Sequence, residues 1–330
     1  WSVPEIVYSL DDCDTRILIV DGTFARMADG IRAKARHAPI FIYAGDGPAP
    51  DGMLSYEALI AATAPAEDAG RGGDDLANVM YTGGTTGFPK GVMQSHMNLW
   101  SSCVQRMAEQ APMKDGVALH AAPLFHIGAM ARAISQFVAG ETHAIIPMFE
   151  PGAVLEAIER FGIKETLLVP TMLQALVNHP DFDKRDLSSW QRVIYGASPI
   201  AVSALEAIMA KLPQVEFCHA YGLTEACPIV SANPHENHMP EGRKSGLSRS
   251  VGRGGFGVNV KIVDPEGREM PRGEVGEIIV RGPNIMKGYW NKPEETAKAL
   301  RDGWLWTGDG AYMDEAGYMF IVDRMKDMIV

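Results

Sequence analysis

The sequence predicts an α/β protein in which layers of parallel sheet are covered by helices, followed by a small antiparallel β subdomain. Short runs rich in β-branched and aromatic residues alternate with helical patterns through residues 1–235, and Pro, Gly and Asp stand at the joints. Residues 236–330 instead show strand-like runs separated by short turns, a pattern typical of antiparallel pairing. We therefore expect an α/β body over residues 1–235 and a β-rich subdomain over residues 236–330.

The expected elements follow in chain order. Ser2 and Glu5 form a capping-box pattern with Pro4 in the first turn, which predicts a helix at the start of the chain. Strands of the body are expected at residues 16–20, 40–43, 76–81, 142–146, 166–169 and 192–195. Helices are expected at residues 95–108, 153–160 and 202–211. A polar loop is expected at residues 231–250, and later strands at residues 258–263, 276–281, 309–313 and 318–322.

Composition narrows the classes of function. The formal net charge of −11 argues against a nucleic-acid partner, because such proteins carry a basic surface. No apolar run approaches the roughly 18 residues that a membrane-spanning helix needs. The four cysteines are scattered without a CxxC pair, which favours neither a zinc ribbon nor a disulfide scaffold. A reducing, cytoplasmic location is the expectation.

The segment at residues 81–91 (YTGGTTGFPKG) carries the strongest chemical signal. It holds four glycines, three threonines and a lysine. Glycines let the backbone turn its N–H groups toward an anion, and a lysine supplies the compact charge that a polyphosphate needs. A Walker A loop is excluded because Pro89 and Gly91 flank Lys90. A strand before it and a helix after it are the setting expected for phosphate binding, whereas an ordinary turn with a solvated lysine is the alternative.

Residues 82–96 (TGGTTGFPKGVMQSH) resemble the phosphate loop of the adenylate-forming superfamily. That superfamily includes acyl-CoA synthetases, coumarate-CoA ligases, firefly luciferase and the adenylation domains of peptide synthetases. Four further segments resemble its motifs in the same order: residues 195–199 (YGASP), 220–225 (AYGLTE), 306–309 (WTGD) and 323–327 (DRMKD). These motifs cover most of the chain, and the fatty-acyl and coumarate-CoA ligases are the most similar branch.

The resemblance implies roles for single residues. The ATP phosphates would lie against Thr82, Gly83, Gly84, Thr85, Thr86, Gly87 and Lys90. The adenine and the acid would lie near Gly196, Ala197, Ser198, Tyr221 and Gly222. The α-phosphate would contact Thr224, the Mg²⁺ ion would bind Glu225, and the ribose would bind Asp309 and Arg324. The catalytic set would be Thr85, Lys90, Glu225 and His126, and Asp327 would be the hinge to a further domain.

His126 lies in residues 123–128 (PLFHIG), which resemble the family's aromatic-His segment at the acyl pocket. There it would gate the pocket or orient the carboxylate. The alternative for a lone histidine in an apolar run is a buried side chain with its hydrogen bonds satisfied.

The implied activity joins a fatty or aryl carboxylic acid to CoA. ATP and Mg²⁺ would be used to form an acyl-adenylate, and the CoA thiol would then displace AMP. Three alternatives stay open: a catalytically silent nucleotide-binding module, a peptide-synthetase-like enzyme and a luciferase-like enzyme, the last two with a different acceptor. Compared with the superfamily, the chain is expected to lack an N-terminal segment and the C-terminal domain, and to be poorly active alone. A homodimer is left open.

Overall fold

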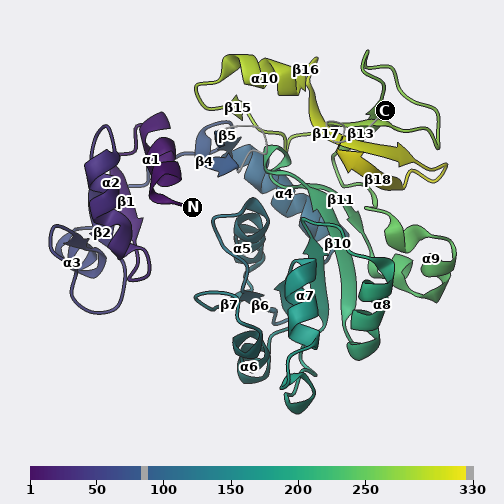
Figure 1. Cartoon of the computed structure of the whole chain (residues 1–330), viewed down its shortest axis with the longest axis horizontal. Coiled ribbons are helices and arrows are strands. Elements are labelled where there is room, and N and C mark those ends of the chain that lie inside the picture. The colour runs from purple at the N-terminus through teal and green to yellow at the C-terminus, as the bar shows by residue number, and fades with distance from the viewer. Residues whose placement is uncertain (83–87, 325–330) are drawn as a thin grey trace.

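The computed structural model describes the backbone of residues 1–82 and 88–324 and the side chains of residues 1–82 and 88–322. Figure 1 shows helices and sheets distributed along the whole chain, with β1, β2 and α1–α3 at one end and the yellow C-terminal strands at the top. The strands form four sheets of seven, five, three and three strands among the residues described. This architecture confirms the predicted α/β class.

The largest sheet has the order β12-β11-β10-β9-β8-β6-β7. Its strands β10, β9, β8, β6 and β7 pair in parallel, and β11 and β12 are added antiparallel at one edge. The strands are β6 Val117–His120, β7 Thr142–Ile145, β8 Glu165–Leu167, β9 Arg192–Gly196, β10 Glu216–Gly222, β11 Ile229–Asn233 and β12 Arg253–Gly254. Its helices are α4 His96–Glu109, α5 Ile127–Ala139, α6 Pro151–Phe161, α7 Pro170–Val177 and α8 Val202–Lys211.

Alternation along β9 assigns the helices to the two faces of this sheet. Val193 and Tyr195 belong to the core that contains Leu155 of α6, Leu173 of α7 and Leu205 of α8. Ile194, between them, points to the other face and lines a cavity beside α4 and α5. Because successive side chains of a strand point to opposite faces, α6–α8 cover one face and α4–α5 the other.

A second sheet is antiparallel throughout and contains β13 Asn259–Val263, β14 Gly276–Arg281, β16 Leu300–Arg301, β17 Trp304–Met313 and β18 Met319–Arg324. Its inner face contributes Ile278, Val280 and Leu305 to a second apolar core, which also includes Tyr221 from β10. The two sheets therefore meet at the end of β10, and this junction positions the site described below.

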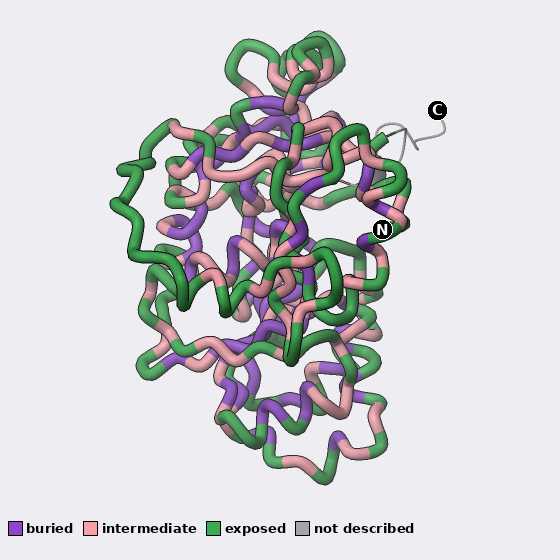
Figure 2. Tube along the Cα trace, turned by 90° about the vertical axis from the view of Figure 1, so that its left-hand side faces the viewer, coloured by how far each residue is buried: buried purple, intermediate pink, exposed green. Residues whose placement is uncertain are grey.

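Two small sheets complete the fold. The first is parallel and contains β1 Ile17–Val20, β2 Ile40–Tyr43 and β3 Leu54–Ser55, with α1 Val3–Asp12, α2 Ala28–Lys34 and α3 Tyr56–Ala62. The second is antiparallel and contains β4 Leu76–Thr82, β5 Lys90–Ser95 and β15 Gly288–Tyr289. Buried segments lie mostly in the interior of the molecule and exposed ones mostly in the loops around it (Figure 2).

The remaining elements are short. They are α9 Pro240–Lys244, α10 Pro293–Ala299 and the 3-10 turns η1 Ala25–Met27, η2 Phe182–Lys184, η3 Thr224–Ala226, η4 His235–His238 and η5 Leu247–Arg249. No helix within residues 1–82 and 88–324 is both long and apolar enough to cross a bilayer. The proposed boundary between residues 235 and 236 remains a prediction.

Several predicted elements are confirmed, and three need correction. The Ser2–Glu5 capping box is present, and α8 has the predicted bounds. The strand expected at residues 166–169 ends at Leu167, because Pro170 begins α7 and Val169 is its N-cap. The loop expected at residues 231–250 contains short helical turns. The phosphate segment does not lead straight into a helix: β5 follows it, pairs with β4, and only then does α4 begin.

Candidate active site

The site forms at the carboxyl ends of β9 and β10, the edge where open α/β sheets bind ligands. The sequence leaves the strands there through residues that permit close backbone contacts. A Cβ on Gly196 would collide with the carbonyl oxygen of Ala220, and one on Gly222 with that of Pro228. Ala197 adopts a left-handed φ of 65°, which turns the chain out of β9. These contacts fix the floor of two adjoining cavities.

The larger cavity has a volume of about 600 Å³ and lies between the ends of β9 and β10 and the antiparallel sheet. Its wall includes most of the residues assigned to adenine and ribose from the sequence: Ala197, Ser198, Tyr221, Gly222 and Asp309. Gly196 lies in the wall of the smaller cavity instead. Arg324 ends β18 opposite Asp309 of β17, and its side chain is outside the described part of the structure.

A hydrogen bond joins the two sheets across the larger cavity. The hydroxyl of Tyr221 donates to Oδ2 of Asp309 at 2.7 Å. The backbone N–H of Asp309 is held in turn by Oγ1 of Thr307 at 3.1 Å. The aromatic ring and the carboxylate that the sequence assigns to a nucleoside therefore stand side by side with their positions fixed, although they belong to different sheets.

A second group of polar residues lies where β5, β15 and η3 meet. The hydroxyl of Tyr289 donates to Oε1 of Glu225 at 2.7 Å. Burial, reinforced by the Glu225 charge, raises the pKa of Tyr289, so its hydroxyl keeps the proton that it donates. Nζ of Lys90 lies 4.3 Å from the centre of the same ring and 3.8 Å from Oε2 of Glu295. The structure thus brings Lys90 and Glu225 together around one tyrosine.

Sequence reasoning missed Tyr289 and the residues that hold the η3 turn. Gln94 donates to the carbonyl of Thr224 at 2.8 Å, and Asn284 donates to that of Ala226 at 2.8 Å. The available signal was the aromatic pair Tyr289-Trp290 in a segment without a clear strand pattern. The pairing of β15 with β5, which places Tyr289 beside Lys90, could not be read from it.

The Mg²⁺ assignment can be tested on the donor set. No cluster of three or more His, Cys, Asp or Glu side chains exists among the residues that the structure describes. Mg²⁺ in nucleotide enzymes usually takes one or two carboxylates, with phosphate oxygens and water as its other ligands. Glu225, oriented by Tyr289, fits that limited role.

Other predicted residues can be placed only in part. Thr82 ends β4 and pairs with Lys90 at the start of β5, so these two residues frame the glycine loop. Gly83, Gly84, Thr85, Thr86, Gly87 and Asp327 lie outside the described residues. Their assigned roles stay predictions.

His126 is the N-cap residue of α5 and is exposed, with its ring 4.7 Å from that of Phe125. The alternative of a buried, satisfied histidine is therefore wrong. The next two residues, Ile127 and Gly128, line the smaller cavity, so His126 stands beside that cavity rather than in its wall.

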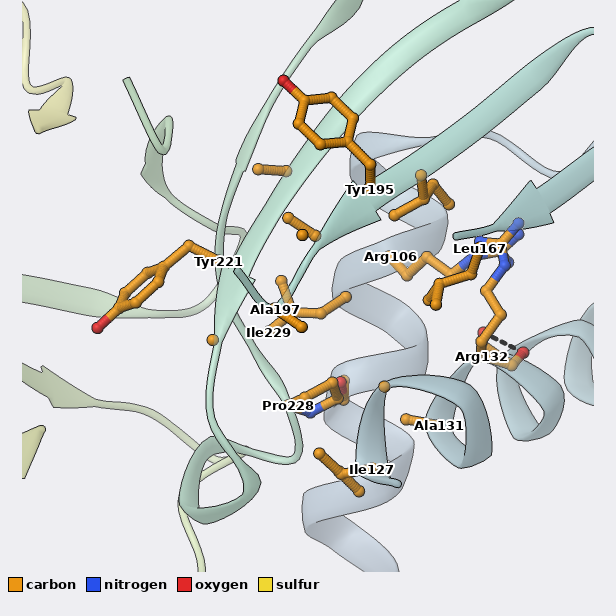
Figure 3. Close-up of a pocket in the computed structure, with 18 of the residues that line it drawn as sticks. Arg106, Ile127, Ala131, Arg132, Leu167, Tyr195, Ala197, Tyr221, Pro228 and Ile229 are labelled. Carbon is orange, nitrogen blue, oxygen red and sulfur yellow. Dashed lines mark hydrogen bonds between the residues drawn. The ribbon is translucent and has the colours of Figure 1, made fainter. Parts of the chain in front are cut away.

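The smaller cavity, of about 140 Å³, lies between α4, α5 and the sheet. Figure 3 shows it between Tyr221 on one side and the pair Arg106 and Arg132 on the other, with Ile127, Ala131 and Pro228 along its length. Most of the rest of its wall is apolar. It shares five wall residues with the larger cavity: Tyr195, Ala197, Ala220, Tyr221 and Gly222. The arrangement suits two ligands, or one ligand of two parts, that meet at this shared wall.

Comparison with known proteins identifies the family. The family model described as AMP-binding enzyme matches residues 1–290. Feruloyl-CoA synthase from Amycolatopsis sp is 38% identical over 329 residues, which cover 99% of this chain and 62% of that protein. 4-Coumarate–CoA ligase 2 from Oryza sativa subsp. japonica is 39% identical over 86% of this chain and 51% of its own length. The chain therefore spans only part of the length of these relatives.

Solved structures support the same family assignment. The amide bond synthetase McbA from Marinactinospora thermotolerans matches with a TM-score of 0.85 and 32% identity over 100% of this chain and 64% of its own. The N-terminal domain of FACL13 from Mycobacterium tuberculosis matches with a TM-score of 0.86 and 28% identity, covering 98% of this chain and 78% of its own. The chain belongs to the AMP-binding enzyme family and has the fold of the N-terminal domain of adenylate-forming enzymes.

Proposed function

We propose that this chain is the ATP- and acid-binding part of an AMP-forming acid–thiol ligase that activates a carboxylic acid and transfers it to CoA. The observation that carries the proposal is the shared wall of the two cavities. The larger one has room for a nucleotide beside Tyr221 and Asp309, and the smaller one has room for the body of an acid. A carboxylate at the wall formed by Ala197 and Gly222 would stand next to the α-phosphate.

The reaction takes place in two steps. A carboxylate oxygen bonds to the α-phosphorus while the bond to the β-phosphate oxygen breaks, giving an acyl-adenylate and pyrophosphate. The sulfur of a thiol then attacks the acyl carbon, its proton is lost, and AMP leaves. In the first step negative charge moves onto the leaving pyrophosphate, so the protein's contribution is positioning and charge stabilisation.

Four polar side chains have a defined task in this scheme. The ring of Tyr221 offers a stacking face for adenine, and Asp309 can accept hydrogen bonds from the ribose hydroxyls while the Tyr221 hydroxyl fixes its orientation. Lys90 brings a positive charge to the polyphosphate. Glu225 would hold Mg²⁺, which neutralises phosphate charge when bound.

The relatives indicate which group accepts the activated acyl group. Relatives named as CoA ligases favour a thiol, and CoA in particular. The second candidate is an acceptor other than CoA. A fatty acid–[acyl-carrier-protein] ligase that is 34% identical favours a carrier protein, and the matching structure McbA, an amide bond synthetase, favours an amine. Both candidates form the same acyl-adenylate and differ in what attacks it.

Binding experiments test the common first step. We would measure thermal unfolding and calorimetric affinities with Mg-ATP, AMP and non-hydrolysable acyl-adenylate analogues. A ligand at a hundred times its dissociation constant stabilises the folded state by about 2.7 kcal/mol. We expect an acyl-adenylate analogue to shift the transition well beyond AMP, because it occupies both cavities.

A matched pair of variants tests whether the nucleotide binds in the larger cavity. Asp309→Ala should weaken every adenosine ligand, whereas Glu315→Ala, which removes an exposed carboxylate in the turn after β17, should leave all affinities unchanged. An unaltered protein that binds neither ATP nor any acyl-adenylate analogue would contradict the proposal.

A further inference from the structure

Helix α1 contacts the strands that carry residues assigned to the polyphosphate. It packs on the small sheet of β1, β2 and β3, where Val7 shares a core with Val20 and Phe41. The last residue of the helix, Asp12, reaches β4: the hydroxyl of Tyr81 donates to its Oδ2 at 2.6 Å. Figure 1 shows α1 between the small sheet and β4. The helix therefore links the N-terminal part of the chain to the sheet of β15, β5 and β4.

Asp12 is bonded to both edges of that three-stranded sheet. The strand order is β15-β5-β4, so β5 is the middle strand. Tyr81 makes the contact at the β4 edge, and on the β15 side Nε1 of Trp290 donates to the backbone carbonyl of Asp12 at 3.0 Å. Lys292 follows Trp290 closely in sequence, and its Nζ lies 3.6 Å from Oδ1 of Asp12. The Asp12 side chain is only 14% exposed, so salt screens this ion pair less than it would one in open solvent.

These contacts end on one row of residues across the sheet. Tyr81 pairs with Gly91 of β5, and the backbone N–H of Trp290 donates to the carbonyl of Gly91 at 2.7 Å. A Cβ on Gly91 would lie 3.0 Å from Cζ of Tyr81, so the missing side chain makes room for the tyrosine ring. Lys90 precedes Gly91 and Tyr289 precedes Trp290. The row therefore adjoins both residues that meet at the polyphosphate side of the site.

A second contact of α1 lies just before β5. The ring of Tyr8 stacks on that of Phe88, with ring centres 4.8 Å apart and planes inclined by 23°. Phe88 is 75% exposed, so no core fixes its position and the stack supplies a constraint instead. Phe88 stands two residues before Lys90. The helix thus contacts the chain at Tyr81 and again at Phe88, on either side of the glycine-rich segment.

The small sheet gains rigidity from such contacts. β15 contributes only two residues, and a strand pair such as β4 and β5 depends on further strands or on packing against a helix. A site whose strands move must lose that freedom when a ligand binds, and the affinity falls accordingly. Fixing the row beside Lys90 and Tyr289 should therefore favour the ligand that uses both residues, which is the Mg²⁺-bound polyphosphate.

We propose that α1 is a positioning element for the polyphosphate site. Asp12 fixes the row of Tyr81, Gly91 and Trp290, and Tyr8 fixes Phe88. This inference rests on the proposed function, since it takes Lys90 as a residue that binds the polyphosphate. Asp12 and Tyr8 act through other side chains, so neither is a catalytic residue.

Tyr81→Phe is the mildest test, because it keeps the ring beside Gly91 and removes only the hydroxyl that donates to Asp12. We expect the affinity for Mg-ATP, measured by calorimetry, to fall by about five- to tenfold, since the row loses a hydrogen bond to a charged group. The affinity for AMP should stay within twofold, because AMP has no β- or γ-phosphate for Lys90. A merely structural role would lower stability without changing the ratio of the two affinities.

Variants of Asp12 test the other partner of this bond. Asp12→Ala should give the same selective loss, and Asp12→Asn, which keeps an acceptor for Tyr81, should lie between Asp12→Ala and the unaltered chain. In the double variant Tyr81→Phe/Asp12→Ala the two losses should not add, because both remove one contact. Asp11→Ala is the matched control. It removes the neighbouring carboxylate of α1, which accepts from the backbone N–H of Arg36, and should leave both affinities within twofold.

The outcomes distinguish this inference from the proposed function. Unchanged Mg-ATP affinity in folded Tyr81→Phe and Asp12→Ala, or an equal fall for Mg-ATP and AMP, would overturn the inference and leave the role of Lys90 intact. Tighter Mg-ATP binding in both Asp12→Ala and Asp12→Asn would also overturn it, because the carboxylate would then act by repelling phosphate. An unaltered chain that binds neither nucleotide would count against the proposed function and the inference together. If Asp12→Ala does not fold, Tyr81→Phe and Asp12→Asn still decide.

Discussion

The two cavities differ in what builds them. The nucleotide-sized cavity of about 600 Å³ is shaped by backbone turns at the ends of β9 and β10 and closed by the antiparallel sheet. The smaller cavity of about 140 Å³ is shaped by side chains that α4 and α5 project toward the sheet. They share a wall at Ala197, Tyr221 and Gly222.

This difference explains why short sequence patterns mark one cavity and not the other. A backbone that must pass close to another carbonyl permits few residue types, so Gly196 and Gly222 stand inside recognisable motifs. A cavity formed by side chains from separate helices can change its lining without changing its backbone. We therefore expect the chemistry that members of a family share to depend on the larger cavity, which the backbone shapes. The choice of acid should depend on the smaller cavity, which side chains shape.

The largest expected effect comes from breaking the shared wall. In Gly222→Val the new side chain would meet the carbonyl oxygen of Pro228, so the end of β10 and the start of β11 would have to separate. We expect a loss of about 3 kcal/mol or more in the free energy of unfolding, measured by urea denaturation, together with loss of ATP binding.

The control for this change is Gly72→Val, since a Cβ at Gly72 would meet no other atom within 4 Å. It should alter the free energy of unfolding by no more than about 0.5 kcal/mol. A Gly222→Val protein of normal stability with intact ATP affinity would show that the wall is not fixed by the close backbone contact.

The next effect should be confined to the nucleotide side. Lys90→Met removes the positive charge at the start of β5 that we assign to the polyphosphate. We expect the affinity for Mg-ATP to fall by about ten- to a hundredfold, the range for a hydrogen bond to a charged group, while AMP affinity stays within twofold. Calorimetry with both nucleotides measures the difference.

Lys287→Met, which removes an exposed lysine just before β15, is the matched control and should change neither affinity. An equal fall in the affinities for AMP and for Mg-ATP would contradict the assignment of Lys90 to the polyphosphate.

The sequence predicted the fold well, and it predicted several residues that line the larger cavity, for physical reasons. Strand and helix periodicity gave the α/β class and the bounds of α8, and the motifs gave the larger cavity's Tyr221 and Asp309. It failed where the contact is made by distant segments. Tyr289 reaches Glu225 only because β15 pairs with β5. Arg106 and Arg132 lie on different helices, and no local pattern shows that both face one cavity.

Tyr289 offers a smaller test on the nucleotide side. Tyr289→Phe keeps the ring beside Lys90 but removes the hydroxyl that donates to Glu225. We expect the affinity for Mg-ATP to fall by about tenfold, because Glu225 loses the bond that orients it. The affinity for ATP measured without Mg²⁺ is the internal control and should change by less than twofold. An equal fall with and without Mg²⁺ would remove Glu225 from the metal site.

The smallest effect concerns Tyr195, which lies in the walls of both cavities. Its hydroxyl lies 2.7 Å from Nε2 of the fully buried His238, and burial lowers the pKa of His238 to about 4. In the unfolded chain a histidine has a pKa of about 6.5, so between pH 6.5 and 4 the unfolded state binds a proton that the folded state does not. The free energy of unfolding must therefore fall as the pH falls through this window.

Between pH 7 and pH 6 the contribution of His238 to this fall is about 0.7 kcal/mol. His238→Gln should reduce the measured slope by that amount in urea denaturation at the two pH values. Tyr195→Phe separates titration from the lost contact: it removes the hydroxyl but leaves the buried histidine, so it should lower stability at both pH values and keep the slope. If both variants keep the slope of the unaltered chain, His238 does not couple pH to stability. If His238→Gln alone reduces it, His238 is neutral in the folded protein, and its protonation in mild acid favours the unfolded state.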